Sequence, residues 1–235
     1  MAQYKNYVIA QTLDEAYELN AKKSTVIVAG NMWLRMCGMR RQTALDLSAL
    51  GLDFIKEDEQ GFTIGAMTTL RIMETHPALN AAFGGVFARA LEPIVGTQFR
   101  NSATVGGNLG LRRSDSYLAA ALTAADAVLK SITPHGEQDK PVGEYLQSDC
   151  KRLIEYVVVD KDRTGSVKRF GNTSSSHATL IAAESGGIYA LSVQGSGLIY
   201  GTTPDIAEQV TYVDDLTGSA AYKKYLAGIV FTLGR

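Results

Sequence analysis

Two short segments share one pattern, and this pattern restricts the fold more than any other feature. STVIVAGNMW (residues 24–33) and NSATVGGNLG (residues 101–110) each run from β-branched residues into small residues followed by Asn. A β-branched run favours a strand, and glycine lets the backbone that follows turn with positive φ. Such a turn is either an anion cradle, in which successive amide N–H groups face one concave side, or only a tight corner.

Two turns of this kind suggest one ligand held from both sides. The pyrophosphate of a dinucleotide carries two negative charges and is small enough for both turns to contact it. We expect a side chain at Gly106 or Gly107 to fill the space that its phosphates need. GGNLG has neither the spacing of the GxGxxG fingerprint nor a helix directly at its glycines, and no GxxxxGK[ST] segment occurs. The residues alone therefore predict candidate phosphate-binding turns in an α+β protein.

Length and charge limit the alternatives. A chain of 235 residues favours two compact units over one, and 46% apolar with 20% charged residues is typical of a globular protein. The 23 basic and 24 acidic residues do not favour nucleic acid or an anionic membrane as partner. Cys37 and Cys150 form no metal-binding pair. With no targeting segment and no long apolar run, we expect a cytoplasmic protein.

Local signals predict the following elements. Helices are expected after Thr12, after Thr69, from Pro77 and over residues 116–130, the last buried on most sides. Strands are expected at residues 24–30, before a turn at Gly51, across the acidic EDEQG and over 151–161. Residues 132–146 are expected to be a loop. A second unit, beginning near 160–163, is expected to hold strands, a helix over 176–184 and a final helix over 219–233.

FRNSATVGGN (residues 99–108) resembles the (I/F)RN-x-(A/S)T-(I/V)GGN segment of the flavin-binding subunits of molybdenum hydroxylases, the xanthine dehydrogenase and carbon monoxide dehydrogenase group. VAGNMWL, about 75 residues upstream, is similar to the AGGTDL segment of the same family. The resemblance implies an α+β fold. A PCMH-type FAD-binding domain would span residues 1–160, with subdomains of about 1–53 and 54–160. A small carbon monoxide dehydrogenase flavoprotein-type C-terminal domain would span 161–235.

The resemblance also implies which residues bind FAD. These are Val28, Ala29, Gly30, Asn31, Met32 and Trp33 around the first turn, Thr104, Gly106, Gly107 and Asn108 in the second, and Asp115. Asp115 would accept from a hydroxyl of the adenosine ribose. Trp33 would lie near the flavin ring or serve as a core aromatic. Arg112 and Arg113 would meet the diphosphate or form a solvated pair, and solvent is favoured because backbone N–H groups can hold phosphate without them.

Three departures from the family pattern accompany this assignment. Asn31 stands where the family more often has glycine, and Met32 replaces a threonine and so removes one hydroxyl. The connection from Asn108 to Asp115 is two residues shorter than in the family.

By resemblance, the chain would be the FAD-binding subunit of a molybdenum hydroxylase complex. It would relay electrons from [2Fe–2S] clusters on a small subunit, supplied by a molybdopterin-binding large subunit, through FAD to NAD or another acceptor. No catalytic residue and no metal ligand is expected in this chain, because its three histidines are not arranged for acid–base work. The alternatives are a scaffold or assembly subunit that has lost FAD and, less favoured, a free-standing flavin reductase.

Overall fold

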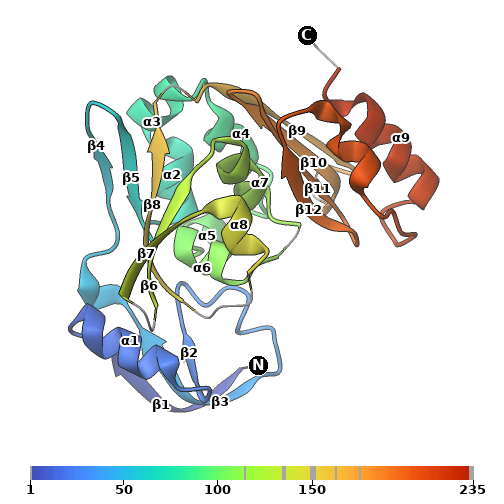
Figure 1. Cartoon of the computed structure of the whole chain (residues 1–235). Helices are drawn as coiled ribbons and strands as arrows, with labels where there is room; N and C mark the ends of the chain where they lie inside the picture. The colour runs from blue at the N-terminus through green and yellow to red at the C-terminus, as the bar shows by residue number, and fades with distance from the viewer. Residues whose placement is uncertain are drawn as a thin grey trace.

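The computed structural model contains three β-sheets, which follow one another along the chain (Figure 1). It describes residues 2–113, 115–133, 136–148, 152–161, 163–174 and 176–232. Within them the sheets fall inside residues 1–53, 54–160 and 161–235. The fold is therefore mixed α+β, as expected, and the division of the chain at those bounds stays a prediction.

The first sheet is parallel and has the order β1-β3-β2, with β1 at Gln3–Ile9, β3 at Arg40–Asp46 and β2 at Thr25–Ile27. Parallel strands of one sheet need a crossover connection, and helix α1 (Leu13–Ala21) lies in the connection between β1 and β2, which flank β3. Its start after Thr12 is confirmed, because the Thr12 hydroxyl accepts from Glu15 N–H at 3.2 Å. Strand β2 leads directly into the first glycine turn.

The second sheet is antiparallel and has the order β4-β5-β8-β6-β7. Its strands are β4 (Ile55–Glu57), β5 (Gly61–Gly65), β8 (Leu153–Asp160), β6 (Val128–Thr133) and β7 (Gly136–Pro141). The two strands expected across the acidic turn are confirmed, as is the turn at Gly51, which follows helix η1 (Ser48–Leu50) and has a left-handed backbone. The loop expected over 132–146 is wrong, because this stretch includes β7 and helix α8 (Val142–Leu146). Strand β7 is a polar, largely exposed edge strand and so lacks the apolar alternation that marks a strand.

Short helices lie between the second and third sheets (Figure 1). They are α2 (Leu70–Thr75), α3 (Pro77–Ala82), α4 (Val86–Leu91), α5 (Thr97–Arg100), α6 (Val105–Gly110) and α7 (Tyr117–Ala124). The starts expected at Thr69 and Pro77 are confirmed, since the Thr69 hydroxyl caps Ile72 N–H and Pro77 occupies the first helical position. These helices and the second sheet enclose the largest apolar core.

Helix α7 is buried along its whole length, as its uncharged, alanine-rich sequence predicts. Leu118, Ala119 and Leu122 pack into the core of the second sheet, whereas Tyr117, Ala120 and Ala124 pack against the third. Small side chains allow both contacts at once. The helix ends at Ala124, and residues 128–130, expected to continue it, belong to β6 instead.

The third sheet is antiparallel and has the order β12-β11-β10-β9. Its strands are β9 (Gly165–Gly171), β10 (Ala178–Ser185), β11 (Ile188–Val193) and β12 (Gly197–Gly201), followed by helices η2 (Pro204–Gln209) and α9 (Ala220–Val230). The final helix is confirmed, with Ser219 as its cap. The helix expected over 176–184 is wrong, because that stretch contains the central strand β10. This strand is buried along nearly its whole length, so its sequence shows no alternation of apolar and polar residues. None of the helices in the described part of the chain has the length and hydrophobicity that a membrane crossing requires.

Candidate functional site

A cleft of about 560 Å³ lies where the two glycine segments meet, a volume typical of a cofactor site. The first sheet forms one wall, and α6, α8 and the start of β8 contribute to the other. Most of the residues implicated by the sequence line it: Ala29, Asn31, Met32, Trp33, Thr104, Gly106, Gly107 and Asn108. Val28, Gly30 and Asp115 do not. The fold thus brings together two segments about 75 residues apart.

The first turn contains two successive left-handed residues, Gly30 with φ 68° and Asn31 with φ 54°. A Cβ atom at Gly30 would lie 1.8 Å from the Ser102 carbonyl oxygen, so no other residue fits there. Gly30 therefore supports the cleft from behind, where it packs against the segment that precedes the second turn. Buried Val28 continues the sheet, with its N–H donating to Leu45 O at 2.8 Å.

The first turn has the amide donors of an anion cradle. The first hydrogen bond within the turn is donated by Arg35 N–H to Asn31 O, at 3.3 Å. The N–H groups of residues 29–34 have no acceptor within the described part of the chain. Since Ala29 and Asn31 to Leu34 line the cleft, this run of amides is the part of the site best suited to phosphate oxygens.

The second turn differs from expectation. Helix α6 begins at the glycines themselves, and Thr104 caps it by accepting from Gly107 N–H at 3.1 Å. Val105 N–H donates to Thr68 O at 3.0 Å, and Gly106 N–H donates to Ala66 O at 2.8 Å. The expected amide cradle is therefore wrong for this segment, because its first amides already have protein acceptors.

The glycines of the second turn serve packing. A Cβ at Gly106 would lie 2.7 Å from Ala66 Cβ, and one at Gly107 would lie 2.9 Å from Thr104 Oγ1 and 3.1 Å from Ala29 O. Our expectation that a side chain there would fill ligand space is wrong, since it would meet protein atoms first. Gly107 allows α6 to approach the first turn closely, and this approach sets the width of the cleft.

Polar contacts tie both turns to the start of α7. Ser116, the cap of α7, donates from its hydroxyl to Asn108 Oδ1. Asp115 accepts from Arg113, with Nε and Oδ1 2.8 Å apart and Nη2 donating to Oδ2. The Arg113 guanidinium lies 4.3 Å from the centre of the Trp33 ring. Trp33 is therefore held at the cleft by a cation–π contact, with 38% of its surface exposed, and is not a core aromatic.

The solvated arginine pair favoured by the sequence argument is wrong as well. Besides the contacts of Arg113, the Arg112 guanidinium lies 4.7 Å from the centre of the Tyr145 ring and donates to Ser148 O. Arg112 also lines the cleft, and its backbone is left-handed with φ 48°. The short connection from Asn108 to Asp115 thus places one arginine in the cleft and the other against Trp33.

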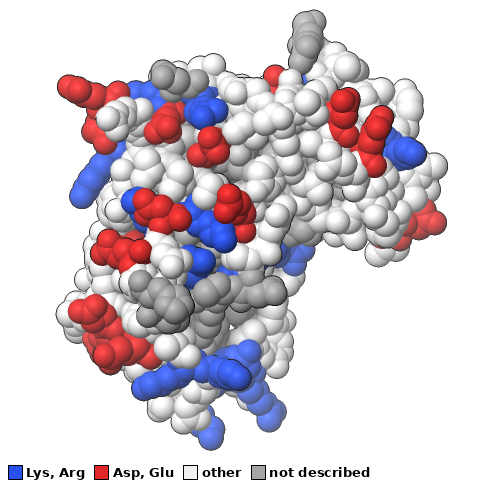
Figure 2. Space-filling model, in the orientation of Figure 1, with Lys and Arg blue, Asp and Glu red and all other residues white. Residues whose placement is uncertain are grey.

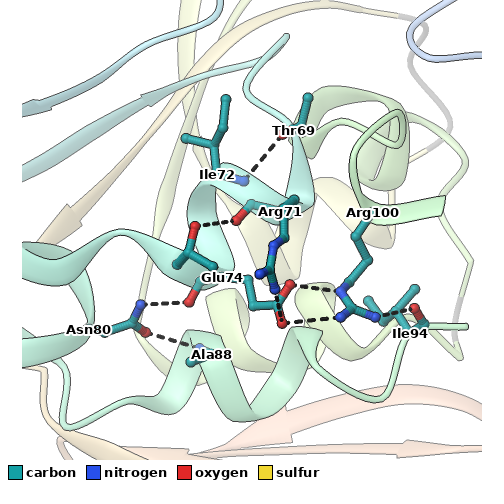
Figure 3. Close-up of polar contacts among 9 residues, drawn as sticks. Thr69, Arg71, Ile72, Glu74, Asn80, Ala88, Ile94 and Arg100 are labelled. Carbon is teal, nitrogen blue, oxygen red and sulfur yellow. Dashed lines mark hydrogen bonds and ion pairs between the residues drawn. The ribbon is translucent and has the colours of Figure 1, made fainter. Parts of the chain in front are cut away.

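Arg100, the arginine of the FRN motif, is a structural anchor (Figure 3). Its Nε and Nη2 donate to Glu74 at 2.7 and 3.2 Å, and its Nη1 donates to Ile94 O at 2.9 Å. Burial raises the pKa of Glu74, but hydrogen bonds from Arg100 and Arg71 outweigh it and leave that pKa below its ordinary value. The pair links α5 to α2 and so positions Ser102, against which Gly30 packs.

The charge of the cleft was not foreseen. Its described lining includes Lys23, Arg41, Arg112 and Arg152 but neither Asp nor Glu. Figure 2 shows Lys and Arg side chains gathered over the first sheet, at the lower edge of the view. A signal was present in the sequence, because residues 22–41 contain five basic residues and no acidic one. Such a lining favours an anionic ligand.

Metal ligands and acid–base groups are not gathered here. No cluster of three or more His, Cys, Asp or Glu side chains suited to a metal occurs among the described residues. His76 caps α3 by accepting from Leu79 N–H, and exposed His177 lies 3.9 Å from Asp115. Cys37 is a free thiol. Cys150 and His135 lie outside the described residues.

Comparison with known proteins gives a consistent picture. Residues 2–159 match the family model described as the FAD binding domain in molybdopterin dehydrogenase. The uncharacterized protein YgfM of Escherichia coli K12 is 27% identical over 93% of this chain and 90% of its own length. The nicotinate dehydrogenase FAD-subunit of Eubacterium barkeri is 22% identical over 63% of this chain and 52% of its own length.

A solved structure has the same fold. The carbon monoxide dehydrogenase from Hydrogenophaga pseudoflava, in a form that lacks the Mo-pyranopterin moiety of the molybdenum cofactor, superimposes with a TM-score of 0.85 at 19% identity. The match covers 97% of this chain and 94% of that one. At this identity the likeness concerns the fold alone, and it includes the C-terminal sheet and α9.

Proposed function

The chain belongs to the family of FAD-binding domains of molybdopterin dehydrogenases, and from this premise we propose that it relays electrons through FAD within a multi-subunit molybdenum hydroxylase. The observation that carries the proposal is the cleft, whose described charged residues are all cationic. A pyrophosphate needs such surroundings, and the unpaired amides of residues 29–34 supply neutral donors beside the charges.

The residues that would hold FAD follow from the cleft lining. We propose that the amides of the first turn hold the pyrophosphate, with Thr104, Gly107 and Asn108 closing the opposite side. Trp33 would lie against the flavin ring. Asp115 stays a prediction from the resemblance: each of its carboxylate oxygens accepts from Arg113 and keeps a second lone pair for a sugar hydroxyl.

The chemistry would belong to the cofactor. When bound, FAD would supply two-electron redox chemistry: it would take up two electrons from iron–sulfur clusters of a partner together with protons from solvent, and the reduced flavin would give a hydride to NAD or another acceptor. This chain would bind and orient the flavin and exclude water from it. Two cysteines cannot supply the ligands of such clusters, so the proposal needs a [2Fe–2S] small subunit and a molybdopterin-binding large subunit. The relatives, named for nicotinate and for carbon monoxide, suggest that those partners choose the substrate.

One experiment tests cofactor binding directly. The purified chain is expected to show a flavin absorption spectrum, and acid should release close to one FAD per chain. Trp33 is the sole tryptophan and lines the cleft, so adding FAD to the FAD-free chain should quench its fluorescence. A colourless protein that neither takes up FAD nor changes its fluorescence would refute the proposal.

The main alternative is a scaffold subunit that keeps the fold without FAD. Met32 favours it, because a thioether lines the cleft where the family usually has a hydroxyl. The same titration decides between the two, since a scaffold would leave Trp33 fluorescence unchanged. Reduction of the loaded chain by NADH then tests whether the nicotinamide site lies in this subunit.

A further inference from the structure

We infer that Arg152 is a pyrophosphate-binding residue of the FAD cleft, an inference that rests on the proposed function. Arg152 immediately precedes β8 and lines the cleft, 48 positions beyond Thr104 in the chain. It is outside both glycine segments, and no motif in the sequence indicates it. Its role follows from the way the fold holds its guanidinium group.

One side of the guanidinium group is fixed by the second sheet. Nη1 donates to Gln138 Oε1 at 3.0 Å and to Ser131 Oγ at 3.4 Å. Ser131 lies on β6 and Gln138 on β7, so both acceptors belong to neighbouring strands of one sheet. Because Nη1 is held in this way, the orientation of the planar group is set before any ligand arrives.

The other side of the group has no protein acceptor. The Nε atom is buried and makes no hydrogen bond with any described residue, and none is formed by Nη2. Arg100 and Arg113 use this same pair of nitrogens to bind a carboxylate in two places. In Arg152, by contrast, Nε is enclosed by protein atoms, and Nη2 is the nitrogen left to donate to a phosphate oxygen in the cleft.

The charge of Arg152 points to an anion. Within the described residues it takes part in no ion pair, although it is half-buried and both acceptors of Nη1 are neutral. A buried donor without a partner is costly, and a cation withdrawn from water without a counter-charge is more costly still. A neutral flavin or adenine ring offers acceptors but no charge, whereas each phosphate of FAD offers both.

The test compares three ligands on FAD-free protein: FAD, ADP and riboflavin. Arg152→Met should weaken binding of FAD and of ADP by about 10- to 100-fold, the usual loss for a hydrogen bond to a charged group. Riboflavin, which has no phosphate, should bind as it does to the wild type. Arg163→Met is the matched control, because it removes the same charge at a residue that pairs with Asp126 outside the cleft. It should leave the affinity for all three ligands unchanged.

Two further measurements separate ligand binding from folding. FAD-free Arg152→Met should unfold at or above the wild-type temperature, because the variant removes an unpaired charge and loses only the neutral contacts to Gln138 and Ser131. Arg152→Lys keeps the charge but loses the planar group that Gln138 and Ser131 orient, so it should bind FAD with an affinity between those of wild type and Arg152→Met. If Arg152→Met does not fold, the FAD affinity of Arg152→Lys still tests whether Arg152 binds the pyrophosphate.

Two results would overturn the inference. One is unchanged FAD affinity in Arg152→Met; the other is an equal loss for riboflavin, which would indicate contact with the flavin ring. Failure of the wild type to bind FAD at all would instead refute the proposed function, so the two failures are distinguishable.

Discussion

Gly30→Ala tests whether the first turn is held in place by its contact with Ser102. The added Cβ would lie 1.8 Å from the Ser102 carbonyl oxygen, at a residue with φ 68°. Gly51→Ala is a matched control, because Gly51 has a similar φ of 64° and nothing lies within 4 Å of the added atom. The two variants share backbone strain and differ in the clash.

The expected magnitudes follow from these two terms. A left-handed conformation costs a residue with a Cβ about 1–2 kcal/mol, which both variants should lose in free energy of unfolding. A Cβ atom hardly ever lies closer than 3.0 Å to another heavy atom, so the turn and Ser102 must separate by about 1.2 Å to relieve the clash. Overpacking of this kind costs about 1–3 kcal/mol more. The same displacement moves the amides that would hold the pyrophosphate, so FAD affinity should also fall in Gly30→Ala.

The measurements are urea unfolding of the FAD-free variants and FAD titration followed by Trp33 fluorescence. Gly51→Ala should lose stability and bind FAD normally. Gly30→Ala should lose more stability and most of its affinity. Equal unfolding free energies for the two variants, together with equal FAD affinities, would show that the contact between the first turn and Ser102 does not shape the cleft.

Three further predictions concern the anchors of the fold. Glu74→Gln should lower the free energy of unfolding by about 3–5 kcal/mol, measured in urea near neutral pH. The pKa of Glu74 is lowered in the folded protein, so the stabilisation by its carboxylate is complete above the ordinary carboxyl pKa. This stabilisation is lost as the pH falls through the pKa of Glu74 in the folded protein. Burial alone would raise the pKa of Asp215, yet the hydrogen bonds from Lys223 and Thr217 lower it to about 2. The free energy of unfolding should therefore fall between about pH 4 and pH 2, and Lys223→Met should make this pH dependence weaker. Thr104→Ala and Thr12→Ala each remove a helix cap worth about 1 kcal/mol, but only the first should weaken FAD binding, and an equal effect of both would count against the role of α6.

Local signals were the most reliable guide to the fold. The helices at Thr12, Thr69 and Ser219 begin as expected because a hydroxyl cap acts within three residues. The errors occurred where partners distant in the chain decide the element. Strand β10 is apolar throughout because it is central in its sheet, and β7 is polar because it is an edge, so neither carries a period that reveals it.

The candidate site divides in the same way. Both glycine segments could be located from the residues and linked to FAD through resemblance, because motifs of this kind are contiguous in the chain. Which groups remain free to bind depends on how distant parts of the chain pack together. The amides at Val105 and Gly106 already have acceptors on the preceding segment, those of residues 29–34 do not, and Arg152 enters the cleft from a different sheet. A free donor is defined by what the rest of the fold leaves unpaired, and no contiguous stretch of sequence contains that information.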